Sequence, residues 1–316
     1  MKSVPISVNI RKNPERLGLA IFLMILAVFL FDTQGAIIKY MGNSYPIQQI
    51  AAIRNLFGLI PSIVLLLLSR DWHRGGRSLR IPQWKIALGR GLVLTFAQIC
   101  LYTSFIKLEF ATASTLIFAG PLFITTLSIP ILGHQVTKWQ WVAVIVGFLG
   151  ILMIVRPGSD IFTPWALLPV IAAMGYGLAI IMVRLVDDDI PSATISLYSS
   201  FSALVGSTIL MLATSGFLEI QTMEDGLWLM SAGIVGGMAV LVLIMAYRLT
   251  MPSKITPFEY FGIPFSFTIG WIIFDEAPFG TLFPGALFIV AAGLLIVWRE
   301  RNQKKMLIEA NNPHRQ

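Results

Sequence analysis

The chain has few of the residues from which catalytic sites and metal centres are built. Among its 316 residues there is one cysteine, Cys100, so an intrachain disulfide and a cysteine-based metal site are excluded. The three histidines, His73, His134 and His314, are far apart in sequence and show no zinc-binding spacing. No phosphate loop, HExxH or GxSxG pattern occurs. The sequence therefore predicts that the protein is not an enzyme, holds no metal or cofactor, and contains no ATP-driven motor.

Charge is also scarce, whereas apolar residues are abundant. Only 12% of the residues are charged and 56% are hydrophobic, with a mean hydropathy of +0.78. A soluble fold of this length could not hide that much apolar surface from water. The net charge of +7 resides in short segments beside apolar runs, which favours contact with lipid headgroups over nucleic acid binding. The composition predicts a protein whose solvent is the lipid bilayer.

Ten apolar segments have a length close to the roughly 20 residues that a membrane-spanning helix needs. The predicted spans are Leu17–Ile38, Pro46–Leu68, Ile86–Ile106, Ala111–Leu132, Gln140–Val155, Trp165–Val183, Ala193–Thr214, Leu227–Tyr247, Ile255–Phe274 and Leu282–Trp298. The first is too long for the core of a removable signal peptide. Short loops leave no room for a soluble domain, so we expect an all-α membrane protein with ten transmembrane helices.

The distribution of basic residues predicts the orientation of these helices. With the N-terminus in the cytoplasm, the cytoplasmic segments hold 18 Lys and Arg residues and the opposite segments hold 3. Such a bias is the positive-inside pattern, and it is consistent with an even number of spans. We therefore expect both termini in the cytoplasm, including a basic tail over residues 300–316.

The two halves of the chain resemble each other when shifted by 143 residues. This shift places Pro121 on Pro264, Gly150 on Gly293 and Arg156 on Arg299. The units would be residues 17–156 and 165–299, with five helices each. Because five is odd, the second unit must enter the membrane inverted relative to the first. Inverted repeats are a recurrent plan of secondary transporters.

Two opposite charges fall inside predicted spans in the outer half of the membrane. Asp32 lies seven residues before Lys39, and Arg54 lies eight residues after Pro46, so the two should have nearly the same depth. Charges at this depth are costly and therefore indicate function. Asp32 and Arg54 are predicted to form a pair that contacts substrate or acts as an outer gate. The alternative is that the ion pair is structural and only locks two helices together.

A third charge lies in a helix that prolines interrupt. Glu259 sits between Pro257 and Pro264, where broken backbone bonding is tolerated if it faces protein or a water-filled cavity. A carboxylate there could bind a cationic group or carry a coupling proton. The alternative is a structural partnership with Arg90 or Arg248. Arg90 itself lies near the cytoplasmic end of its helix, where snorkelling to the headgroups is expected.

Polar and aromatic side chains also recur within the predicted spans. Gln98, Tyr102 and Tyr260 are the candidates for a cavity that binds an amphipathic solute. Simple hydrogen bonding between helices is the alternative for each of them. Further residues of this kind are Thr33, Gln34, Tyr176, Tyr198 and Tyr247.

Two segments carry a family resemblance. Residues Tyr102–Phe123 and Trp139–Pro157 resemble the EamA-type domain of the drug/metabolite transporter superfamily, and the likeness covers nearly the whole chain as two tandem domains. Residues Phe274–Pro278 (FDEAP) resemble the acidic turn that follows the fourth helix of each repeat. The first half departs from this pattern, because it has the sequence GHQV, beginning at Gly133, at the corresponding place. The resemblance implies ten helices, inverted repeats, cytoplasmic termini, a central substrate cavity and no catalytic residues.

The resemblance also implies a function. It indicates a secondary transporter that moves a small organic metabolite or cofactor across a bacterial cytoplasmic (inner) membrane, with uptake favoured over export. The stretch around Glu259 and Tyr260 is similar to that of S-adenosylmethionine uptake carriers, and riboflavin carriers are an equal alternative. Export of amino acids, amines or drugs is a further alternative, as is a polytopic membrane protein that transports nothing. The expected partners are a small-molecule substrate and the bilayer, and a homodimer is left open.

Overall fold

The fold is all-helical over the part of the chain that can be described. The computed structural model describes residues 14–74, 76, 79–133, 138–157, 163–187, 190, 192–249, 255–296 and 298. The first helices are α1 (Pro14–Met41), α2 (Ile47–Leu68), α3 (Arg70–Arg74), α4 (Trp84–Lys107), α5 (Phe110–Ile117), α6 (Gly120–Leu132) and α7 (Lys138–Val155). They are followed by η1 (Pro164–Ala166), α8 (Leu167–Val183), α9 (Ser192–Thr214), α10 (Met223–Leu249), η2 (Thr256–Phe261), α12 (Gly262–Phe274) and α13 (Phe279–Leu282). A C-terminal helix spans Gly285–Ile296.

Eight helical segments are long and apolar enough to cross a membrane, and two shorter apolar helices, Phe258–Phe274 and Gly285–Ile296, match the ninth and tenth predicted spans. This agrees with the prediction of a multi-pass helical membrane protein. Large apolar side chains such as Leu212 and Ile272 are mostly exposed on the helix surfaces. Because lipid is their natural solvent, this exposure is what a membrane-spanning bundle requires.

Two predicted spans are broken rather than continuous. The fourth is divided into α5 and α6, and the ninth begins as the 3₁₀ turn η2 before α12. Proline lacks the amide N–H that would bond to the carbonyl four residues earlier. Pro121 therefore leaves the carbonyl of Ile117 without that bond, and α5 ends at Ile117; Pro264 has the same relation to Tyr260 in η2.

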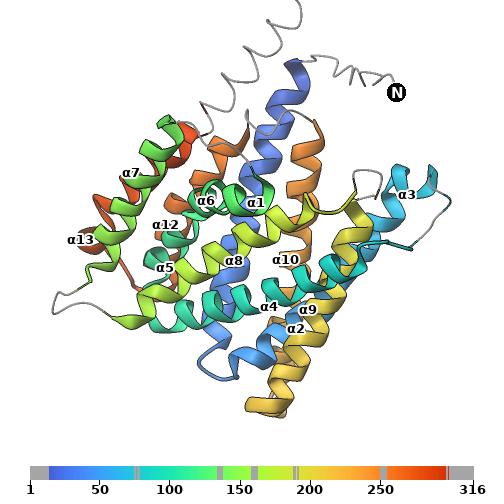
Figure 1. Cartoon of the computed structure of the whole chain (residues 1–316). Helices are drawn as coiled ribbons and strands as arrows, with labels where there is room; N and C mark the ends of the chain where they lie inside the picture. The colour runs from blue at the N-terminus through green and yellow to red at the C-terminus, as the bar shows by residue number, and fades with distance from the viewer. Residues whose placement is uncertain are drawn as a thin grey trace, which may run out of the picture.

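The order of helices in space differs from their order in sequence. Helix α10 lies along both α1 and α2, while α4 packs against α8 and α9 (Figure 1). Small residues permit the closest crossings, as is common in membranes. A Cβ on Gly150 of α7 would be 2.7 Å from the carbonyl oxygen of Gly285, so α7 and the C-terminal helix are in direct backbone contact.

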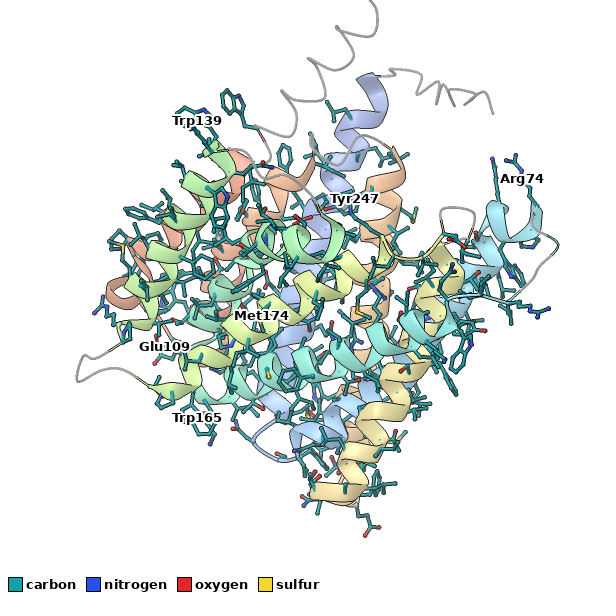
Figure 2. The ribbon with its side chains drawn as sticks, in the orientation of Figure 1. Arg74, Glu109, Trp139, Trp165, Met174 and Tyr247 are labelled. Carbon is teal, nitrogen blue, oxygen red and sulfur yellow. The ribbon has the colours of Figure 1, made fainter. Side chains whose placement is uncertain are left out.

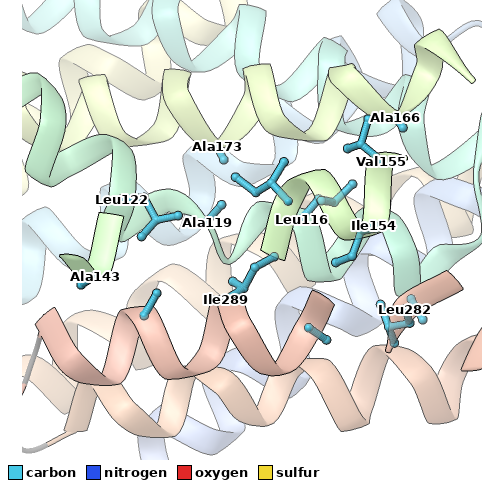
Figure 3. Close-up of a cluster of buried hydrophobic side chains, with 14 of the residues drawn as sticks. Leu116, Ala119, Leu122, Ala143, Ile154, Val155, Ala166, Ala173, Leu282 and Ile289 are labelled. Carbon is cyan, nitrogen blue, oxygen red and sulfur yellow. The ribbon is translucent and has the colours of Figure 1, made fainter. Parts of the chain in front are cut away.

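One apolar core joins the first half of the chain to its last helix. Figure 3 shows Leu116, Leu122 and Ile154 beside Ala173 and Ile289. These residues come from α5, α6, α7, α8 and the C-terminal helix, and all are buried. A second core is formed mainly by α1, α2, α4, α5 and α10.

The tryptophans at helix ends mark the two sides of the bundle. Figure 2 shows Trp139 toward the end where α1 begins and Trp165 toward the opposite end. Both indoles are about half exposed. This is the placement expected of aromatic anchors at the two membrane interfaces.

Candidate functional site

Polar side chains from several helices, most of them buried, meet inside the bundle. We call Gln34, Arg54, Asn55, Gln98, Tyr102 and Ser207 the polar cluster; they come from α1, α2, α4 and α9. Asn55 is the centre of its hydrogen bonding. The Asn55 Oδ1 accepts from Arg54 Nη1 at 2.9 Å, and its Nδ2 donates to Gln98 Oε1 at 3.1 Å and to Ser207 Oγ of α9 at 3.2 Å. Gln98 and Arg54, both predicted site residues, are thus joined through a residue that was not predicted.

The polar cluster has aromatic rings beside it. Tyr102 is buried and accepts a hydrogen bond from Gln34 Nε2 at 3.3 Å. Tyr176 of α8 follows Gly175, whose Cβ would lie 2.9 Å from the Cβ of Ala97, so it lies where α8 packs on α4. Amphipathic rings of this kind can contact both the apolar and the polar parts of a solute.

Asp32 lies on α1, on a stretch that runs beside α5. A Cβ on Gly35 would lie 3.0 Å from the ring of Phe110, at the start of α5, and Val28 and Phe118 both lie over Gly262. Asp32 is therefore flanked by the two ends of α5. Its side chain is 7% exposed, and its Oδ2 has no hydrogen-bond partner.

The ion pair predicted between Asp32 and Arg54 is not formed. The Nε of Arg54 is buried without a partner, and no contact within ion-pair distance links the two residues. The physical reason is the position of α10, which lies between α1 and α2 and separates them. Equal depth in the membrane, on which the prediction rested, does not make two helices neighbours.

Unsatisfied buried groups of this kind are uncommon and call for an explanation. A charged side chain within a membrane span is costly unless it has a partner or serves a function. Asp32 and Arg54 have opposite charges and each keeps a buried atom free. One buried atom of Asp32 and one of Arg54 are therefore available to groups of a bound solute.

The other predicted site residues lie apart from the polar cluster. Glu259 accepts a hydrogen bond from the hydroxyl of Tyr247, which Figure 2 places toward the end where α1 begins. The Nε of Arg90 donates to the Ala179 carbonyl oxygen at 2.9 Å, so Arg90 ties α4 to α8 and is not the partner of Glu259. The side chain of Arg248, the other partner considered, lies outside the described residues.

Tyr260 packs in the region where two broken helices meet. Its ring centroid is 6.0 Å from that of Phe118, and its hydroxyl lies directly over Gly293, where any Cβ would overlap it. The hydroxyl is buried and has no hydrogen-bond partner. Gly293 is thus needed to make room for the Tyr260 ring.

Two important interactions were missed by sequence reasoning. Asn55 is uncharged and adjacent to Arg54, so only its apolar surroundings on α2 could have indicated it. Lys39 was used only as a marker for the outer end of the first span, and its ion pair with Glu276, at 2.6 Å between Nζ and Oε1, was not predicted. Among the described residues, no group of three or more His, Cys, Asp or Glu side chains could hold a metal ion.

Comparison with known proteins places this architecture among transporters. Residues 18–156 match the profile of the EamA-like transporter family. An S-adenosylmethionine uptake transporter of Rickettsia bellii is 26% identical over 83% of this chain and 88% of its own length. A pseudopaline exporter of Pseudomonas aeruginosa is 24% identical over 86% and 93%, and a riboflavin transporter of Vibrio cholerae is 29% identical over 60% and 63%. One crystal structure shares the fold with a TM-score of 0.61 and 17% identity, over 90% of this chain and 99% of that one.

Proposed function

Because the chain belongs to the EamA-like transporter family, we propose that it is a secondary transporter for a small organic metabolite in a bacterial cytoplasmic membrane. The observation that carries this proposal is the polar cluster, which is buried within membrane-spanning helices. Asn55 and Gln98 come from the first half of the chain, and Ser207, which accepts a hydrogen bond from Asn55, comes from the second half. A site between two halves becomes accessible to either side of the membrane when the halves rock against each other.

An inverted-repeat arrangement is part of the proposal. A shift of 143 residues places each helix of one set on a helix of the other: α1 on α8, α2 on α9, α4 on α10 and α6 on α12. The shifted ends agree to within a few residues, except that α1 begins earlier than α8 does. The helix contacts follow the same exchange: α1 packs on α10 as α8 packs on α4, and α2 packs on α10 as α9 packs on α4. These correspondences support two five-helix units, residues 17–156 and 165–299, related by a pseudo-twofold axis.

The substrate class that best fits the site is a solute that carries both charges and an aromatic ring, as S-adenosylmethionine does. Asp32 would bind the cationic part and Arg54 the carboxylate, since each has a buried atom without a partner. Tyr102 would contact the ring. The likeness to S-adenosylmethionine uptake transporters over most of the chain supports this class and the inward direction. Riboflavin, which lacks a fixed positive charge, would not need Asp32.

The remaining predicted residues are proposed to act near the cytoplasmic end. Glu259 and Tyr260 lie on a broken helix, so small movements of η2 relative to α12 can change their exposure. Arg90 would hold α4 against α8 while this end rearranges. With the basic segments in the cytoplasm, both termini are proposed to be cytoplasmic.

A flux assay in proteoliposomes tests the function. The protein should take up labelled S-adenosylmethionine in a saturable way. Asp32→Asn and Arg54→Gln should each lower that uptake at least tenfold, an effect of ~1.4 kcal/mol or more. The matched controls are Glu224→Gln and Lys107→Met, which remove exposed charges and should leave uptake unchanged.

Each outcome of this assay is informative. If the protein takes up riboflavin in a saturable way and Asp32→Asn leaves this uptake unchanged, the substrate class is neutral and not charged. Flux that is lost equally in the controls would show that the cluster has no special role. If a panel of metabolites including amines and amino acids moves in neither direction, the transporter proposal is wrong.

A further inference from the structure

A buried ion pair closes one end of the bundle. Lys39, near the end of α1, is 8% exposed, and its Nζ donates to both carboxylate oxygens of Glu276, at 2.6 and 2.9 Å. The same Nζ donates to the Leu108 carbonyl oxygen at 2.8 Å and lies 5.1 Å from the ring centroid of Phe274. An ammonium group has three hydrogens, so all of its donors are used. Glu276 Oε2 also accepts from the amide of Phe110 at 2.7 Å.

This ion pair joins parts of the chain that would have to separate for the end to open. Lys39 belongs to the first half and Glu276 to the second, and 237 positions separate them. Leu108 and Phe110 lie on either side of Glu109, in the corner between α4 and α5. Figure 2 shows Glu109 at the end of the bundle opposite the start of α1. Beneath the pair lies the apolar core around Phe105 and Phe110.

The repeat-related positions at the other end of the bundle carry no charge. The shift of 143 residues that relates the two halves places Lys39 on Met182 and Glu276 on Gly133. The ion pair between these two positions is therefore not repeated by the pseudo-symmetry. In a transporter that alternates between two pseudo-symmetric states, an interaction present in one state alone stabilises that state.

We propose that Lys39 and Glu276 form a gate at the end assigned to the outside by the charge bias, and that this gate favours the outward-closed state. The inference rests on the proposed transport function, but its test does not require the substrate. Removing both charges leaves no unpaired charge behind, so the double variant Lys39→Met with Glu276→Gln should remain folded.

Thiol labelling of the purified full-length protein measures the opening. Because the chain has a single cysteine, Cys100→Ala provides a background free of thiols. A reporter cysteine replaces Ser104, which is fully buried one helical turn inside Leu108. A second reporter replaces Ala87, also fully buried, at the far end of α4 and about 25 Å away by helix rise. The probe is a water-soluble methanethiosulfonate.

The double variant should raise the labelling rate at position 104 by about tenfold, which corresponds to ~1.4 kcal/mol in the equilibrium between closed and open states. Labelling at position 87 should not rise, and Lys107→Met, which removes an exposed lysine on the same helix, should change neither rate. The charge-swapped variant, Lys39→Glu with Glu276→Lys, should return labelling at position 104 toward the parent value.

Two results would overturn the gate. One is a folded double variant that labels at position 104 as slowly as the parent. The other is an equal rise at positions 104 and 87, because that would reflect general loosening. Faster labelling at position 104 alone, in a protein that moves no metabolite of the panel, would keep the closure by this ion pair and reject the proposed transport function.

Discussion

Replacing Asn55 by leucine should destabilise the protein measurably, because this side chain forms hydrogen bonds with groups of α2, α4 and α9. Its Oδ1 accepts from Arg54 Nη1, and its two Nδ2 hydrogens are shared among Gln98 Oε1, Ser207 Oγ and the Ala203 carbonyl oxygen, at 2.9–3.3 Å. Hydrogen bonds between membrane helices contribute about 0.6 kcal/mol each on average, and those with a charged partner more. Asn55→Leu should therefore lower the free energy of unfolding by about 2–3 kcal/mol.

The measurement is the unfolding free energy of the purified protein in mixed micelles, for the parent and for variants. Thr103→Val is the matched control, since the Thr103 hydroxyl donates only to the Ile99 carbonyl of its own helix, at 2.7 Å. Its loss should be well below 1 kcal/mol. A double-mutant cycle of Asn55→Leu with Gln98→Leu isolates the bond between the two amides. If Asn55→Leu unfolds like Thr103→Val and the cycle shows strict additivity, the hydrogen-bond network does not exist in the membrane protein.

Three further predictions concern other parts of the bundle. Glu259→Gln and Tyr247→Phe should each lower substrate flux without loss of expression, because the first removes the negative charge and the second removes the hydrogen bond that Glu259 accepts. Normal flux in both variants would make this contact purely structural. Asp32→Asn and Arg54→Gln should have additive effects on unfolding free energy, within about 0.5 kcal/mol, because they are not paired; a larger coupling would mean that they meet. Gly150→Ala should lower the melting temperature, because its Cβ would be 2.7 Å from a backbone oxygen; an unchanged melting temperature would show that the two helices separate easily.

Local sequence patterns predicted much of the fold. Every span that a run of apolar residues predicted corresponds to apolar helical structure in the described residues. The reason is that a helix in lipid must satisfy its backbone hydrogen bonds within itself, so its existence depends on its own residues. The same holds for the interruptions at Pro121 and Pro264, where a missing amide N–H acts within one turn.

The sequence also indicated polar residues that the structure brings together, but not their neighbours. Arg54 and Gln98 are linked through Asn55, and Tyr102 is hydrogen-bonded to Gln34, since polar groups in apolar spans turn toward each other and away from lipid. The contact between Gln98 and Arg54 nevertheless depends on Asn55, which carries no charge and stands out little in the sequence.

What only the tertiary structure decided is which helices touch. The insertion of α10 between α1 and α2 keeps Asp32 from Arg54, and the meeting of Lys39 with Glu276 spans 237 positions. The burial of apolar surface does not select which helices pack together, because lipid tails solvate that surface as well as another helix does. Helix partners are instead selected by close packing at small residues such as Gly150 and by a few polar contacts. Both depend on three-dimensional shape, so the sequence determined the spans of this protein and the tertiary structure determined its site.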